Sequence, residues 1–230
     1  GFGRIGRCVL RALYASAHRE HFRIVAINEP APAETIAHLL KYDSTHGRFP
    51  FEVTLKEKTL FVDGDEILLS SPENNETPAW QKLNLPIDIL FDCTGLSIDD
   101  SYIEKLKKTG VNKILFSQPT EGVLDKTVVF GVNHQELNQS HQWVSNASCT
   151  SNCIAPVIDV LNKNFSLVSG MITTIHSAMN DQPVIDAYHH QDLRKTRSAM
   201  QSIIPVDTSL AKGLKRVVPN LEAPFEATAL

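Results

Sequence analysis

The sequence contains few cysteines and little net charge, and each shortage excludes a class of protein. Its four Cys in 230 residues are too few for the disulfide framework of a small secreted domain. Its formal net charge at pH 7 is −4, whereas a general nucleic-acid binder carries a basic patch or a high isoelectric point. We therefore expect no nucleic-acid partner, and a reducing cytoplasm is the simplest compartment for the protein.

Long apolar runs are also missing from the sequence. No stretch approaches the roughly 20 apolar residues that a membrane-spanning helix needs, so we expect no membrane partner. The chain has 42 % hydrophobic and 21 % charged residues, a composition typical of a soluble globular protein. Its length is enough for one large domain or two ordinary domains.

The chain opens with a G-x-G-x-x-G pattern, GFGRIG, at residues 1–6. An amphipathic helical pattern follows, and a strand-like run over residues 22–28 then leads to Glu29. A glycine-rich turn, a helix, a strand and an acidic residue about 20 positions downstream form a dinucleotide-binding fingerprint. A simple glycine-rich turn is the alternative interpretation.

Each glycine of this fingerprint has its own task. Gly1 permits the tight turn, Gly3 lets the backbone approach the pyrophosphate, and Gly6 allows the helix to pack closely on the sheet. The N-terminus of the helix then binds phosphate. Glu29 would accept hydrogen bonds from the adenosine ribose and repel a 2′-phosphate, so the pattern favours NAD over NADP. Because such a turn normally follows a strand, we expect the sequence to be a fragment without its central first strand.

Beyond Glu29 the apolar pattern alternates between strand-like and helical segments, as expected of a mostly parallel sheet with crossover helices. We find no internal repeat. The expected helices cover residues 33–41 and 101–109, and the expected strands lie within 49–70 and at 87–92, 113–117, 128–131 and 143–145.

Small polar residues follow two of these strands. In doubly wound sheets, ligands bind outside the carboxyl ends of the strands. We therefore expect Thr94 and Gly95, which follow the strand at 87–92, to face the cofactor, and we assign Ser117 at the end of the next strand to the same site. An ordinary turn is the alternative for Thr94 and Gly95.

Cys149 lies where a valine-rich strand gives way to a helical pattern, within the run SNASCTSNC at residues 145–153. A thiol at a helix N-terminus meets the positive end of the macrodipole and unpaired backbone N–H groups. Both stabilise the nucleophilic thiolate. The alternative is a small buried hydrophobe, which describes most free cysteines. Cys153 has no partners at zinc-binding spacing, and we interpret it as a packing residue.

One reaction would use a bound NAD, a reactive thiolate and a histidine together. Cys149 attacks an aldehyde to form a hemithioacetal, whose carbon gives a hydride to the nicotinamide and leaves a thioester. His176, which closes a strand-like run over residues 167–176, takes the hydroxyl proton and stabilises the thiolate. The alternative is a structural histidine at the end of a strand.

The long polar segment 177–204 follows His176. Loops of this length in compact domains are usually functional or disordered. Its basic cluster at residues 194–197 would either form a solvated face or, beside Thr150 and Thr208, hold a phosphate through charge-assisted hydrogen bonds. The adjacent His189 and His190 cannot readily share one metal ion without further ligands, so we predict no metal site.

These motifs resemble the glyceraldehyde-3-phosphate dehydrogenase superfamily along the whole chain. The match is carried by residues 1–7, 41–47, 93–95 and, with the highest specificity, 145–153. The resemblance implies an α/β fold in which a Rossmann doubly wound NAD-binding domain at residues 1–147 precedes an α+β catalytic domain with an antiparallel sheet at 148–230. Both domains would be truncated here. It also implies a homotetramer for the full-length protein.

The resemblance further implies a role for each site residue. Cys149 would be the nucleophile and His176 the base. The substrate, a small phosphorylated aldose, would be held by Ser148, Thr150, Lys195, Arg197 and Thr208. The NAD-binding residues would be Gly1, Phe2, Gly3, Arg4, Ile5, Gly6, Glu29, Thr94, Gly95 and Ser117.

Some positions depart from the glycolytic members of the family. Met179 stands where a hydroxyl residue is usual, and Lys195 replaces an Arg, which keeps the charge but loses bidentate geometry. Residues 201–208 read QSIIPVDT instead of ending in a run of Ser and Thr. These features resemble the D-erythrose-4-phosphate dehydrogenase branch, which oxidises erythrose 4-phosphate to 4-phosphoerythronate on the bacterial route to pyridoxal phosphate.

Two of these departures bear on the step that resolves the thioester. Phosphorylating members of the family need inorganic phosphate to attack it. Asp207 adds negative charge and Val206 removes a hydroxyl donor near where that phosphate would bind, so we expect water to be the acceptor. The alternatives are a phosphorylating glyceraldehyde-3-phosphate dehydrogenase and a NAD-binding module that has lost its chemistry.

Overall fold

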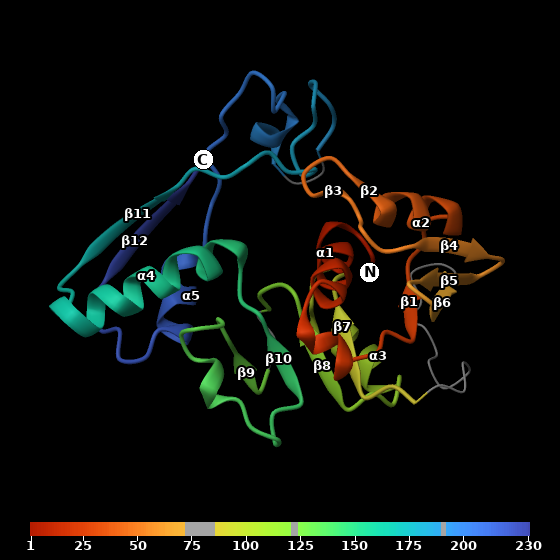
Figure 1. Ribbon diagram of the computed structural model, residues 1–230. Coiled ribbons are helices and arrows are strands. Elements are labelled where there is room, and N and C mark those ends of the chain that lie inside the picture. The colour runs from red at the N-terminus through yellow and green to blue at the C-terminus, as the bar shows by residue number, and fades with distance from the viewer. Residues whose placement is uncertain (72–85, 121–123, 190–191) are drawn as a thin grey trace. The chain divides into compact units, whose positions relative to one another are not determined.

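The computed structural model describes residues 1–71, 86–120, 124–189 and 192–230 (Figure 1). The chain forms two units. The first consists of Gly1–Lys126 and Asn138–Asn146, and the second of Thr127–Leu137 and Ala147–Leu230. Within the described residues, no helix has both the length and the apolar character needed to span a bilayer.

The first part of the first unit is a four-stranded sheet with two helices. The strand order is β1-β6-β5-β4, in which β4, β5 and β6 pair antiparallel and β6 pairs parallel with β1. A buried apolar cluster that includes Leu10, Leu40, Leu60 and Ile67 holds the helices and strands together. The elements are α1 (Arg4–Tyr14), η1 (Ala17–Glu20), β1 (Ala26–Asn28), α2 (Ala33–Lys41), β2 (Tyr42–Asp43), β3 (Gly47–Arg48), β4 (Val53–Lys56), β5 (Thr59–Val62) and β6 (Asp65–Ser70).

A second four-stranded sheet in this unit has the order β7-β8-β10-β9. The strands β7, β8 and β10 run parallel, and helix α3 connects β7 to β8. Ile103 and Leu106 of α3 are buried in one cluster with Ile114 and Phe116 of β8. The elements are β7 (Ile89–Asp92), α3 (Asp100–Lys107), β8 (Lys113–Phe116), β9 (Lys126–Thr127) and β10 (Trp143–Ser145).

The expected strand at residues 128–131 is wrong. Residues 128 and 129 have no regular secondary structure, residues 130 and 131 lie in a turn, and Gly131 adopts the left-handed region with φ +85°. The side chain of Asn133 explains the difference, since its Oδ1 accepts from the Val129 N–H at 2.8 Å and its Nδ2 donates to the Thr127 carbonyl at 3.0 Å. The backbone groups of Thr127 and Val129 therefore bond to an amide side chain instead of a neighbouring strand.

The second unit contains the long helix α4 and the strand pair β11–β12. A buried cluster that includes Ala155, Ile158, Leu210 and Leu214 packs α4 against α5. The elements are η3 (His134–Glu136), α4 (Cys149–Phe165), β11 (Gly170–Thr174), η4 (Leu193–Thr196), α5 (Leu210–Val217) and β12 (Phe225–Ala229).

The strands of the second unit differ from the antiparallel sheet that the resemblance implied. β11 and β12 pair in parallel, from Gly170 opposite Phe225 to Thr174 opposite Ala229. The long connection between them contains α5, and a crossover of this length returns the chain in the same direction. An isolated bridge between Val206 and Ala229 is antiparallel. The fold class, mixed α/β with parallel and antiparallel sheets, is nevertheless confirmed.

Candidate active site

The glycine turn at the start of α1 leaves room on one side only. A Cβ on Gly1 would lie 2.7 Å from the Cys93 carbonyl oxygen and from Thr94 Cα, and a Cβ on Gly6 would collide with the Gly1 carbonyl. A Cβ on Gly3 would meet no atom within 4 Å. Gly6 therefore packs against the turn itself, whereas the space beside Gly3 is open to a ligand.

The N-terminus of α1 suits a phosphate group. Gly3 is its N-cap, no side chain caps the helix, and no acidic residue lies in the first turn. Backbone N–H groups without a protein partner and the positive end of the helix dipole together attract anions. These residues therefore fit the pyrophosphate of a dinucleotide.

Glu29 lies at this turn, as its position after β1 predicted. Its Oε2 accepts a hydrogen bond from the backbone N–H of Phe2 at 2.5 Å, and its own backbone N–H donates to the Ser70 carbonyl at 2.9 Å. The carboxylate therefore fixes the glycine turn, a role that the sequence pattern did not indicate.

Thr94 and Ser117 lie at one edge of the second sheet of the first unit. β7 and β8 pair in parallel with Asp92 opposite Phe116, so the residues that follow both strands emerge on the same side. The Ser117 N–H donates to the Asp92 carbonyl at 2.9 Å. Gly95 adopts φ +72°, a conformation that glycine reaches without strain. The expected cofactor residues of both strands thus emerge at one edge of the sheet, and Thr94 lies beside Gly1.

Cys149 is the first residue of α4. The N-cap is Ser148, whose Oγ accepts from the Ser151 N–H at 3.0 Å. The preceding Ala147 is buried and has φ +56°, a left-handed conformation that costs free energy for a residue with a Cβ. Cys149 itself is exposed, so its interpretation as a buried hydrophobe is wrong.

The Sγ of Cys149 lies 3.4 Å from His176 Nε2. The other ring nitrogen, Nδ1, lies 2.8 Å from the Ser177 carbonyl oxygen. Because a carbonyl only accepts, Nδ1 carries the hydrogen, and the Nε2 of a neutral imidazole is then an acceptor that faces the thiol. The His176 N–H also donates to the Leu230 carbonyl at 2.9 Å, which continues the ladder between β11 and β12 to the histidine.

Hydroxyl groups surround the start of α4. Ser148 Oγ lies 3.0 Å from Thr150 Oγ1 and 2.8 Å from Ser151 Oγ, so the residues on either side of Cys149 in the sequence belong to one hydroxyl cluster. Cys153 is exposed, which contradicts its interpretation as a packing residue. The reason is its spacing, since residues four apart share one helix face and the thiol of Cys149 is exposed on that face.

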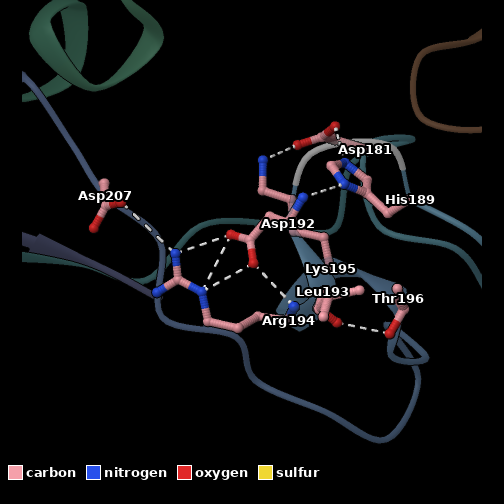
Figure 2. A network of polar contacts seen from close by, with 8 residues as sticks. All are labelled: Asp181, His189, Asp192, Leu193, Arg194, Lys195, Thr196 and Asp207. Atoms are coloured by element: carbon pink, nitrogen blue, oxygen red, sulfur yellow. Dashed lines mark hydrogen bonds and ion pairs between the residues drawn. The ribbon is translucent and has the colours of Figure 1, made fainter.

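The basic cluster of the long loop is paired with acids (Figure 2). Arg194 donates to both carboxylate oxygens of Asp192, at 2.9 Å from its Nη2 and 3.1 Å from its Nε, and its Nη2 lies 3.7 Å from Asp207 Oδ2. Lys195 Nζ lies 2.5 Å from Asp181 Oδ2. The three acids were not predicted as partners, because loop pairs follow no sequence period.

The same arrangement holds for Arg197, whose Nη1 lies 2.6 Å from Asp186 Oδ2. The pKa of Asp181 is lowered, first by the hydrogen bond from Lys195. The pKa of Asp186 is lowered by the Ser198 backbone N–H and then by Arg197. Lys195 and Arg197 would therefore meet a substrate phosphate as members of ion pairs and not as isolated cations.

Thr208 lies just before α5 and follows Asp207, the carboxylate that Arg194 approaches. Its Oγ1 accepts from the Leu210 N–H at 3.2 Å. An open hollow of about 480 Å³ adjoins it, lined by Asp207, Thr208, Ser209, Ala211 and Lys212. The hollow therefore offers hydroxyl groups and one cation, with the carboxylate of Asp207 beside them.

We predicted no metal site because the adjacent His189 and His190 cannot readily share one metal ion without further ligands. His189 Nε2 lies 3.4 Å from Asp181 Oδ1, and His190 lies outside the described residues. Among the described residues, no group of three or more His, Cys, Asp or Glu side chains is placed to hold a metal ion.

Two protein-family models match the chain. Residues 1–100 match the model described as glyceraldehyde 3-phosphate dehydrogenase, NAD binding domain. Residues 148–230 match the model described as glyceraldehyde 3-phosphate dehydrogenase, C-terminal domain. The first match assigns NAD as the cofactor, in agreement with the open space beside Gly3 and the uncapped N-terminus of α1. The chain belongs to the glyceraldehyde-3-phosphate dehydrogenase family and has the domains of an NAD-dependent dehydrogenase.

Proposed function

We propose that this chain carries the catalytic residues for the NAD-dependent oxidation of D-erythrose 4-phosphate to 4-phosphoerythronate. The observation that supports the chemistry is the pair formed by Cys149 Sγ and His176 Nε2, 3.4 Å apart at the start of α4. The hydrogen bond between Nδ1 and the Ser177 carbonyl supports His176 as the base. We place the reaction in the cytoplasm, on the route to pyridoxal phosphate, in a homotetramer of the full-length protein.

The chain's own residues account for the acid–base steps. His176 Nε2 takes the thiol proton, and the Cys149 thiolate attacks the aldehyde carbon. The aldehyde oxygen takes that proton back from His176, which completes the hemithioacetal and leaves the imidazole neutral again. The N-terminus of α4 provides backbone N–H groups near the oxygen that becomes negative in this attack. His176 accepts the hydroxyl proton as the carbon is oxidised to a thioester. Bound NAD supplies the hydride acceptor for that oxidation.

The proposed acyl acceptor is water. After the proton taken from the hydroxyl has passed to solvent, His176 would take a proton from that water as it attacks the thioester and give it to the leaving thiolate, which releases the acid and regenerates the thiol. The support comes from the hollow beside α5, where the carboxylate of Asp207 faces solvent. Val206 adds no hydroxyl donor there, and its N–H is already bonded to the Ala229 carbonyl. An anionic acceptor would therefore meet like charge.

A phosphorylating glyceraldehyde-3-phosphate dehydrogenase is the second candidate. Two cations favour it, because the Arg194 guanidinium lies 3.7 Å from Asp207 and Lys212 lines the same hollow. Together they offset the charge of Asp207. The ratio of kcat/KM for erythrose 4-phosphate to that for glyceraldehyde 3-phosphate separates the two functions. We expect a ratio above one, and a ratio well below one would establish the second candidate.

A NAD-binding module without chemistry is the candidate from a different class. Iodoacetamide labelling of the full-length protein at neutral pH tests it. We expect labelling at Cys149, and the Cys153→Ser variant is the matched control because Cys153 is exposed on the same helix. If the labelling rate of Cys149 is no higher than that of Cys153, the thiol is unactivated and the binding module is favoured.

A further inference from the structure

Asp92 is a buried acidic residue at the end of β7 that no step above uses. Its exposed fraction is 3 %, and burying a carboxylate is costly unless hydrogen bonds compensate it. Tyr102 Oη donates to its Oδ2 at 2.6 Å, and the N–H and hydroxyl of Thr94 donate to its Oδ1 at 3.0 and 2.8 Å. All three donors are neutral groups.

The Tyr102 hydroxyl is suited to act as a hydrogen-bond donor to Asp92 at all times. Tyr102 lies on α3, which connects β7 to β8. Burial, followed by the hydrogen bond to Asp92, raises the pKa of Tyr102. The phenol therefore keeps its proton at neutral pH and remains a donor to the carboxylate.

The Asp92 side chain sets the conformation of the turn that follows β7. The Thr94 hydroxyl donates to Asp92 and accepts from the Leu96 N–H at 3.3 Å. The chain between these two bonds passes through Gly95 at φ +72°. One carboxylate oxygen thus fixes both the backbone and the side chain of Thr94.

The Asp92 backbone extends this control to two neighbouring segments. Its carbonyl accepts from the Ser117 N–H at 2.9 Å. The Cys93 carbonyl and Thr94 Cα, which come next, lie so close to Gly1 that a Cβ there would approach them to 2.7 Å. Asp92 is therefore connected to three segments that we assign to the cofactor: the glycine turn, the Thr94 turn and the end of β8.

We propose that Asp92, held by Tyr102, is a positioning residue of the NAD site that acts through Thr94. It lies beneath the edge of the sheet and does not itself touch the cofactor. The inference rests on the proposed assignment of Gly1, Thr94 and Ser117 to NAD binding. A purely structural role, in which the buried hydrogen bonds only stabilise the first unit, is the competing explanation.

The test compares NAD binding with stability in the full-length protein. The variants are Tyr102→Phe and Asp92→Asn, which nearly keep side-chain size. Thr109→Val is the matched control, because it removes two other buried hydrogen bonds of the same unit. Thr109 Oγ1 donates to the Leu106 carbonyl at 2.6 Å and accepts from the Val111 N–H at 3.3 Å. The Kd for NAD is measured by calorimetry, and Tm by thermal unfolding.

We expect each test variant to raise the Kd for NAD about tenfold, as the loss of one hydrogen bond to a charged group does. Thr109→Val should lower Tm without changing the Kd. The double variant Asp92→Asn/Tyr102→Phe should be little worse than either single variant, because both remove one coupled interaction. With substrate, the variants should raise the KM for NAD and leave kcat within about threefold.

A Kd within twofold of the wild type in both test variants, together with a lowered Tm, would overturn the proposal in favour of the structural role. A different result would refute the proposed function. A wild-type protein that binds NAD but oxidises neither aldehyde would refute that function, and the comparison of NAD Kd values would still decide the role of Asp92.

Discussion

At the scale of single residues, the proposed chemistry depends on two side chains, Cys149 and His176, that lie 27 positions apart in the sequence. Cys149 could be predicted from its motif, and His176 from its position at the end of a strand-like run. Their contact could not, because it requires the ladder between β11 and β12 to continue to the Leu230 carbonyl. The acidic partners of the basic cluster were also beyond prediction, since loop ion pairs depend on backbone conformation alone.

Replacing His176 tests its role as the base while the nucleophile Cys149 stays in place. We expect His176→Asn to lower kcat by about 10²- to 10⁴-fold, the usual contribution of a general base, and to slow iodoacetamide labelling of Cys149. His134→Asn is the control, because His134 belongs to the second unit and bonds only to the nearby Gly131 N–H among the hydrogen bonds described for its ring. Equal rates for His176→Asn and the wild type would remove His176 from the mechanism.

An added methyl group should weaken NAD binding at both Gly3 and Gly6 but should lower stability only at Gly6. Gly3→Ala places its Cβ in open space and keeps a φ of −68°, so we expect unchanged stability and at least tenfold weaker NAD binding as the methyl group obstructs the ligand. Gly6→Ala drives its Cβ into the Gly1 carbonyl, so both stability and binding should fall. Calorimetry with NAD and thermal unfolding check both variants. Tight NAD binding by Gly3→Ala would contradict the assignment of this turn to the cofactor.

At the scale of elements, the sequence predicted most helices and strands, because their apolar residues recur with the period of the element. The helix at 33–41 and the strands within 49–70 are confirmed. Two errors have local causes. The segment at 128–131 bonds to the Asn133 side chain, which competes with a neighbouring strand. The parallel direction of β12 follows from α5 in the preceding connection, which the strand pattern itself does not contain.

The ion pairs of the long loop should make its order depend on pH. The pKa values of Asp181, Asp186 and Asp192 are lowered in the folded chain. Each carboxylate therefore stabilises the loop above its unfolded pKa, near 3.8, and loses this effect as the pH falls through its lower folded value. We expect the loop to lose order below about pH 4.

Amide hydrogen exchange measures this loss directly. The Ser198 N–H donates to Asp186 Oδ1 at 3.0 Å, whereas the neighbouring Ala199 N–H donates to the Pro183 carbonyl at 2.8 Å. The protection factor at Ser198 should decline with acid before that at Ala199, which has no titrating acceptor. In the Asp186→Asn variant the difference between the two amides should vanish. A pH-independent protection factor at Ser198 in the wild type would show that the carboxylate does not hold the loop.

At the scale of the whole molecule, the residues proposed for each part of the chemistry lie in different units. The first unit carries the glycine turn and the strand ends assigned to NAD, and the second carries Cys149 and His176. The family could be predicted from short motifs, because the glycine turn and the SNASCTSNC run are chemical requirements. The proposed substrate choice rests on a few departures from the glycolytic sequences, among which the charge of Asp207 is partly offset by Arg194. The proximity of Arg194 to Asp207 could not be predicted from the sequence.

Hydrolytic oxidation of erythrose 4-phosphate is tested most directly by measuring NADH formation from this substrate by the full-length protein, with and without inorganic phosphate. If water resolves the thioester, the rates should be equal in both conditions, with 4-phosphoerythronate as the product. The Asp207→Thr variant, which removes a negative charge and adds a hydroxyl donor, should gain rate from phosphate. No NADH without phosphate, and an acyl phosphate product with it, would contradict hydrolytic resolution of the thioester.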